Sequence, residues 1–157
     1  NSLVITALLI GLLLPHPAQE QVEPRGVWPL GPRHVVVAAF DPPATRWGRG
    51  HRGVDLLGRV GQQVHAARAG TVRFVGRIGG KPVIVVGHGA TRTTYEPVRA
   101  VVEVGARVPA GAVIGQLRGS PSHCWPRACL HWGLLRGRTY LDPLTLVWRQ
   151  VRLLPLG

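Results

Sequence analysis

Glycine and proline interrupt this chain too often for long helices to form. The 157 residues include 21 glycines and 14 prolines, and helix-length windows free of both are almost absent. Both residues are unfavourable inside helices, whereas the plentiful valine suits strands. Apolar runs punctuated by Gly or Pro recur about every eight to twelve residues, which is typical of a sandwich or barrel. We therefore predict an all-β chain with strands within 34–40, 62–78, 82–89, 91–98, 106–117 and 129–137.

One segment near the C-terminus has the features of a helix start. In the stretch 140–154, "YLDPLTLVWRQVRLL", Asp142 suits an N-cap and Pro143 suits the first helical position. β-branched residues interrupt the rest of this stretch and weaken its helical character. The alternatives are one short C-terminal helix or an irregular end.

The chain opens with a twelve-residue apolar run, Leu3 to Leu14. This run is too short to span a bilayer core of about 30 Å at 1.5 Å per residue, so it predicts a signal-peptide core, with an uncleaved anchor as the alternative. We assign 1–18 to this N-terminal apolar segment, 19–27 to a linker and 28–157 to a single domain. The protein is accordingly expected to be secreted or held in the cell envelope.

The net charge of +12 comes almost entirely from arginine, because Lys81 is the only lysine. Such a charge favours a polyanionic partner. Single-stranded nucleic-acid binding also needs aromatic residues spaced among the basic ones, and the sequence has no such array. We therefore expect no nucleic acid, and the anionic polymers of a cell envelope fit the sign of the charge.

Two short fragments contain residues that bind metals. "GHRGVDL" (50–56) supplies His51 and Asp55, and "CLHWG" (129–133) supplies His131. Zinc binds nitrogen and oxygen donors, and a catalytic zinc keeps three protein ligands and one open position. Each fragment is a weak signal alone, but together they suggest one metal site.

The order of the fragments along the chain resembles a known family. Residues 27 to 137 are similar to the β-sheet core of the lysostaphin and LytM type zinc peptidases, which cleave peptide cross-links in peptidoglycan. The resemblance implies an antiparallel β-sandwich or barrel-like core, a zinc cofactor and peptidoglycan as the partner. It is carried by "WPL", "AAF", "GHRGVDL", "GQQVHAARAGTVRFVG", "VIVVGHG", "TTYEPV", "VEVGARVPAGAVIGQL" and "CLHWGL".

Three zinc ligands follow from this resemblance, and two catalytic histidines are missing. The family's His-x-x-x-Asp motif matches His51 and Asp55, and the second histidine of its His-x-His motif matches His131. The first histidine of His-x-His is replaced by Cys129, and the histidine of the Tyr-x-His-Leu motif is replaced by Pro97. The resemblance thus predicts a zinc site with both catalytic histidines replaced.

Cys129 has three alternative states. As a thiolate it would be a fourth zinc ligand and would close the site. In an exported chain it would form a disulfide with Cys124, which is the state we expect. As a free thiol it would be a nucleophile, although no neighbouring base is evident.

Other residues are candidates for the missing catalytic groups. His123 is the best replacement histidine, because a Cys124–Cys129 bridge would hold it near the site; the alternative is an exposed loop histidine. The hydroxyl of Tyr95 is a candidate for stabilising the oxyanion. Strand alternation predicts that Glu96 faces away from the metal if Tyr95 faces toward it.

Two arginines, Arg52 and Arg92, are further candidates for stabilising the oxyanion. The predicted zinc site and the two replaced catalytic histidines are compatible with two functions. The first is a zinc metalloendopeptidase acting on peptidoglycan cross-links. The second is a catalytically inactive LytM-like module that binds peptidoglycan or activates a partner hydrolase. A monomer is expected in either case.

Overall fold

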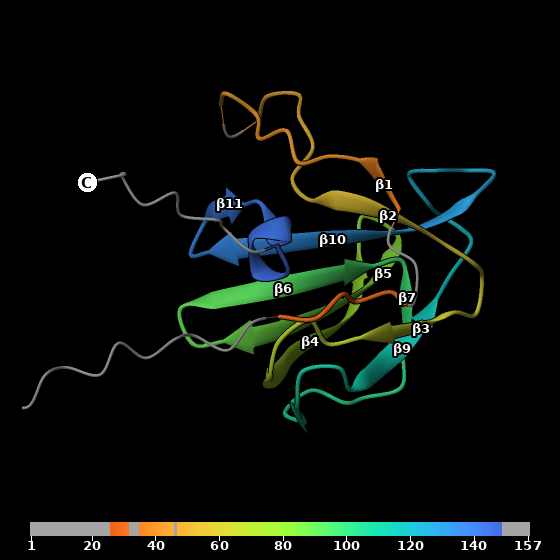
Figure 1. The fold of residues 1–157 in the computed structure, drawn as a ribbon, viewed down its shortest axis with the longest axis vertical. Coiled ribbons are helices and arrows are strands. Elements are labelled where there is room, and N and C mark those ends of the chain that lie inside the picture. Colours follow the sequence, from red (N-terminus) through yellow and green to blue (C-terminus); the bar gives the residue numbers. More distant parts are fainter. Residues whose placement is uncertain (1–25, 32–34, 46, 149–157) are drawn as a thin grey trace, which may run out of the picture.

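The computed structural model describes residues 26–31, 35–45 and 47–148, and within them the chain forms two antiparallel β-sheets (Figure 1). The prediction of an all-β antiparallel fold is confirmed. The larger sheet has the order β1 (Val36–Ala38), β2 (Val54–Gly58), β10 (Ala128–Arg136), β6 (Thr91–Glu96), β5 (Lys81–His88), β4 (Gly70–Ile78) and β8 (Arg107–Val108), with β11 (Thr139–Leu141) beside β10. The smaller sheet has the order β3 (Gln63–His65), β9 (Val113–Leu117) and β7 (Val98–Ala100).

The core lies between the two sheets. Alternate residues of a strand point to opposite faces, and on β10 and β6 the residues Trp132 and Tyr95 face inward with no exposed surface. Ile84 of β5 and Ile114 of β9 pack into the same cluster from the two sheets. Each such side chain contributes about 1.5 to 3 kcal/mol by its burial. The side chains that alternate with these core residues along each strand point to the outward face of the larger sheet.

Glycines at two tight turns set the ends of strands. Gly89, with φ of 74°, lies at the turn of the hairpin that β5 and β6 form. Gly111, with φ of 81°, follows Pro109, and Ala112 closes this turn by donating to the carbonyl of Pro109 at 3.2 Å. Residues other than glycine rarely adopt these positive φ values.

The predicted C-terminal helix is one turn of 3₁₀-helix, Pro143–Leu146. Asp142 is its N-cap, because its Oδ1 accepts a hydrogen bond from the Leu144 amide at 2.9 Å. The remainder of the predicted helix beyond residue 148 lies outside the described residues.

The predicted signal segment 1–18 and nearly all of the predicted linker also lie outside the described residues. The assignment of 28–157 to one domain therefore stays a prediction at its ends. Among the residues that are described, no helix is long and apolar enough to cross a membrane.

Candidate metal centre

Neighbouring strands bring the three predicted ligands together. Asp55 lies on β2 and His131 on β10, and the antiparallel register places them directly opposite each other. His51 precedes β2 and is held there by an isolated bridge, in which its backbone exchanges two hydrogen bonds with Asp41. The ligand pattern of the sequence therefore converges in space on the outward face of the larger sheet.

The distances among these side chains suit a tetrahedral metal. His131 Nδ1 lies 2.8 Å from Asp55 Oδ1, and His51 Nε2 lies 3.2 Å from the same oxygen. His51 Nε2 and His131 Nδ1 are 3.1 Å apart. Donors about 2.0 to 2.2 Å from one tetrahedral zinc lie roughly 3.3 to 3.6 Å from one another. The nitrogen and oxygen donors present thus fit zinc in chemistry, and they lie slightly closer together than a bound zinc would hold them.

Contacts around the ligands fix their orientation. Nδ1 of His51 donates to the Ala39 carbonyl at 2.7 Å, which leaves the lone pair of Nε2 directed at the cluster. Gly53 allows His131 to lie close, because a Cβ at this position would come within 2.9 Å of the His131 ring.

Asp55 is the anionic centre of the cluster and is nearly buried. Burial alone raises the pKa of its carboxyl. Hydrogen bonds from His123 and His131, with the charges of His131 and His51, outweigh burial and hold this pKa well below its usual range. Asp55 is therefore ionised, as a metal ligand must be.

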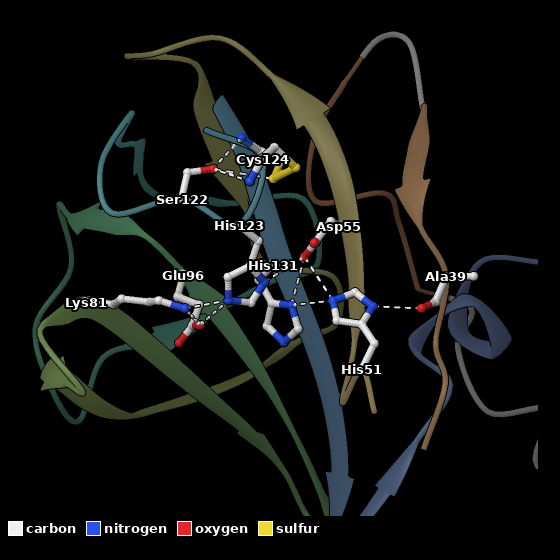
Figure 2. Close-up of polar contacts among 10 residues, drawn as sticks. Ala39, His51, Asp55, Lys81, Glu96, Ser122, His123, Cys124 and His131 are labelled. Atoms are coloured by element: carbon white, nitrogen blue, oxygen red, sulfur yellow. Dashed lines mark hydrogen bonds and ion pairs between the residues drawn. A yellow bond between two sulfur atoms is a disulfide. The ribbon is translucent and has the colours of Figure 1, made fainter. Parts of the chain in front are cut away.

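His123 is the fourth member of the cluster (Figure 2). It lies between β9 and β10, and its Nδ1 is 3.4 Å from Asp55 Oδ1. The centroids of the His123 and His131 rings are 4.7 Å apart. One donor atom from each of His51, Asp55, His123 and His131 lies within 4.8 Å of the others. The structure thus places His123 beside the predicted ligands, in a loop and with an exposed side chain.

A disulfide joins Cys124, the residue after His123, to Cys129 of β10. The hydroxyl of Ser122 accepts hydrogen bonds from the amides of Cys124 and Cys129, at 3.2 and 3.3 Å. His123 is therefore flanked by two residues that are both tied to the start of β10. Of the three states considered for Cys129, the structure has the disulfide.

The prediction that Tyr95 faces the metal is wrong. In the register between β6 and β10, Tyr95 pairs with Trp132 in the core, on the opposite face from His131. Its hydroxyl accepts a hydrogen bond from the Ala67 amide at 2.8 Å, and burial raises its pKa to about 12. Tyr95 therefore has a structural position and is not available to a reacting group at the cluster.

Glu96 is the residue that sequence reasoning misplaced. It pairs with His131 and lies on the outward face. Its Oε1 is 3.8 Å from His123 Nε2 and 3.2 Å from Lys81 Nζ, and Lys81 Nζ also contacts His123 Nε2. Figure 2 shows Glu96 and Lys81 on the side of His123 away from His51. Alternation along the strand correctly predicts that Tyr95 and Glu96 lie on opposite faces. The assignment of Tyr95 to the metal-facing side was wrong, because Glu96 lies on that side.

The two arginines proposed near the oxyanion line a separate pocket. Arg52 and Arg92 share this pocket of about 490 Å³ with Arg138, Trp47 and Tyr140. The ligand cluster is not among the described residues that line it.

Comparison with known proteins places the fold and the cluster in context. Residues 49–143 match a family model described as Peptidase family M23. The uncharacterized protein Rv2891 of Mycobacterium tuberculosis is 48% identical over 136 residues, covering 83% of this chain and 55% of that protein. The chain thus spans about half the length of the curated relatives it matches.

Solved structures share the fold. A zinc containing peptidase from Vibrio cholerae has a TM-score of 0.64 at 20% identity, over 76% of this chain and 39% of that chain. A mutant catalytic domain of the prophage-encoded M23 protein EnpA from Enterococcus faecalis has a TM-score of 0.62 at 21% identity, over 76% and 95%. The antimicrobial peptidase lysostaphin from Staphylococcus simulans has a TM-score of 0.61 at 23% identity, over 71% and 48%.

Proposed function

Because the chain belongs to peptidase family M23, we propose that it is a zinc-dependent endopeptidase that cleaves peptide cross-links of peptidoglycan. The observation that carries this proposal is the convergence of a third histidine, His123, on the three predicted ligands. That residue supplies an acid or base group in a chain that has lost both catalytic histidines of the family pattern. The apolar segment at 3–14 further supports action outside the cytoplasm, in the cell envelope.

Three residues, His51, Asp55 and His131, would hold the zinc. A zinc ion bound by two histidines and a carboxylate polarises a carbonyl and lowers the pKa of a bound water to about 7. The chain's own contribution is an ionised Asp55 and a His51 whose Nδ1 is already engaged by Ala39. Both features prepare the donors before a metal arrives.

His123 would move the proton in the reaction. Its Nδ1 faces the cluster at Asp55, and its side chain is 34% exposed, so that a substrate can reach the ring. Glu96 and Lys81 contact the opposite nitrogen, Nε2, and would keep the ring in this orientation. Positioned acid and base groups contribute about a hundred to ten-thousand-fold in rate. His123 alone would restore much of the rate enhancement that is lost when Cys129 and Pro97 replace the two catalytic histidines.

Two substitutions separate metal binding from proton transfer. We expect His51→Ala to lose bound zinc, because one of three ligands is removed. We expect His123→Ala to keep its zinc and to release peptides from purified peptidoglycan about a hundredfold more slowly, or worse. Zinc content by mass spectrometry and release of amino groups measure the two effects. His65→Gln, on the smaller sheet, is the matched control and should change neither.

Other outcomes would count against the proposal. Full zinc occupancy in His51→Ala would show that the ligand assignment is wrong. A zinc-loaded wild-type chain that binds peptidoglycan without releasing any amino group would leave the inactive binding or hydrolase-activating module as the better description. Equal activity of His123→Ala and wild type would remove His123 from the mechanism.

A further inference from the structure

The arginine-lined pocket lies on the same face of the larger sheet as the metal centre. On β6, Arg92 is four residues from Glu96, and on β10, Leu135 is four residues from His131. Residues an even number apart share a face of a strand. The pocket and the cluster therefore open onto one continuous surface along β6 and β10.

The separation matches a short stretch of extended peptide. At about 3.3 Å per residue, four residues along a strand span about 13 Å. A peptide lying along β6 and β10 with one bond at His131 would thus place a residue about four positions away beside Arg92. The pocket is within reach of the same substrate that the cluster would cleave.

Two small residues lie on the sheet surface between the metal cluster and the arginine-lined pocket. Thr94 and Gly133 pair across β6 and β10 midway between the cluster and the pocket. A Cβ on Gly133 would come within 2.5 Å of the Thr94 hydroxyl, so this hydroxyl lies over Gly133 and no larger residue fits there. Small residues therefore form the surface between the cluster and the pocket.

The chemistry of the pocket suits a carboxylate. Arg52, Arg92 and Arg138 line it, and none of the described residues that line it is an aspartate or a glutamate. The planar guanidinium group binds carboxylates through two parallel hydrogen bonds. Two aromatic residues, Trp47 and Tyr140, provide apolar walls for the rest of the bound residue.

Contacts within the pocket hold two of these arginines in place. Nη1 of Arg92 donates to the Gly137 carbonyl at 2.8 Å. The Arg52 guanidinium lies 5.7 Å from the centroid of the Tyr140 ring, and its Nη2 donates to the Gly48 carbonyl at 3.2 Å. An ordered guanidinium loses less conformational entropy when it binds an anion.

A second pocket continues the first. It has a volume of about 350 Å³ and shares Arg52, Arg138 and Tyr140 with the arginine-lined pocket, with Pro42 and Pro43 among its other residues. The space is therefore sufficient for a whole charged side chain together with its neighbours.

We propose that this pocket binds a free carboxylate of the peptide substrate, about four residues from the cleaved bond, and so selects acidic peptides. This inference rests on the proposed endopeptidase function for its substrate. The placement of three arginines around one cavity carries it, together with the face of β6 and β10 that the cavity shares with the cluster.

Equilibrium binding of two synthetic peptidoglycan stem peptides tests the proposal. The peptides differ in one group, which is the free α-carboxylate of the glutamate in one and a carboxamide in the other. With the full chain loaded with zinc, we expect the acidic peptide to bind about tenfold more tightly by calorimetry, because a charge-assisted hydrogen bond is lost on amidation.

Substitution of Arg138 completes a thermodynamic cycle. Arg138 is exposed at a turn, so Arg138→Gln should not affect folding. We expect it to weaken binding of the acidic peptide about tenfold and to leave the amidated peptide within about twofold. Arg107→Gln, on β8 at the far edge of the sheet, makes the same charge change and should alter neither affinity.

The outcomes distinguish this proposal from the proposed function. Equal affinity for the two peptides, or an equal loss for both in Arg138→Gln, would overturn the carboxylate site. A preference for the acidic peptide that depends on Arg138, in a chain that cleaves no peptide, would keep the carboxylate site and overturn the endopeptidase. Cleavage of both peptides without any preference would overturn the carboxylate site alone.

Discussion

At the scale of single residues, the Tyr95 hydroxyl joins parts of the core that are distant in sequence. It accepts a hydrogen bond from the amide of Ala67, between β3 and β4, and bonds to Thr93 on its own strand, both at 2.8 Å. Thr93 also bonds to Nε2 of His88 at 2.8 Å. Ala67, Thr93 and Tyr95 have no exposed surface, so their polar groups depend on one another for hydrogen-bond partners.

We predict that Tyr95→Phe destabilises the fold by about 1 to 3 kcal/mol, because the buried Ala67 amide loses its acceptor. Burial raises the pKa of Tyr95 from 10.0 to about 12, so above pH 10 the unfolded chain loses this proton before the folded chain does. The stability due to the hydroxyl is therefore complete below pH 10 and is lost between pH 10 and 12. Urea unfolding should show the advantage of wild type over Tyr95→Phe shrinking by roughly 1 kcal/mol near pH 11. An unchanged advantage at that pH would contradict the buried position of the hydroxyl.

The positions of some site residues can be predicted from the sequence, and those of others cannot. The identities and spacing of His51, Asp55 and His131 are weak signals alone, and the resemblance to a family of zinc peptidases is what makes this ligand cluster predictable. The positions of Tyr95 and Glu96 depend on the phase of a strand, and a shift of one residue exchanges the two faces. That phase is set by pairing with Trp132 across β10, which no local pattern reveals.

At the scale of elements, the connection between β9 and β10 positions His123. The Cys124–Cys129 disulfide ties this connection to the first residues of β10. The hydroxyl of Ser122 bonds to the amides of both cysteines and so ties the residue on the other side of His123 to the same point. The histidine is thus held at the cluster by a covalent link and by local hydrogen bonds.

Removal of this link should loosen His123 without disturbing the three proposed zinc ligands. We predict that the double variant Cys124→Ala with Cys129→Ala keeps its zinc, because the disulfide-bonded cysteines are not among the proposed ligands. The entropy of closing so short a loop suggests a loss of about 2 kcal/mol in stability. We expect hydrolysis of peptidoglycan to slow by about tenfold, since an acid or base group that is less well positioned is less effective. Wild-type rates in the double variant would show that hydrogen bonds alone position His123.

The sequence predicts the positions of several strands well, but it does not predict where a longer apolar segment divides into two strands. Gly and Pro punctuation located β5, β6 and β10 within a few residues, because these residues end strands for local reasons. The predicted strand 91–98 is divided at Pro97, which lacks an amide for the ladder. The sequence does not predict β2 as a strand and indicates only the metal-binding motif there. Glycines flank its short apolar run, and its pairing with β10 is what makes it a strand.

At the scale of the whole molecule, charge and geometry act together. The net charge of +12 attracts anions over the whole surface, whereas the pocket gathers three arginines at one place beside the proposed cleavage path. The composition alone indicated an anionic partner. It could not indicate this pocket, because Arg52, Arg92 and Arg138 come from three separate segments that only the folded sheet brings together.

Salt should therefore act on capture of the substrate rather than on the chemical step. The Debye length falls from about 10 Å at 0.1 M to about 3 Å at 1 M ionic strength, so attraction between the basic surface and an acidic peptide is screened. Contacts of about 3 Å within the metal centre, such as that between Asp55 and His131, are screened much less. We predict that kcat/KM for an acidic stem peptide falls at least tenfold over this range while kcat changes by less than about twofold. The amidated peptide is the control and should show a smaller fall, since it lacks one negative charge. Equal salt effects on kcat and kcat/KM would mean that salt disturbs the metal centre itself, which would contradict capture through the arginine-rich surface.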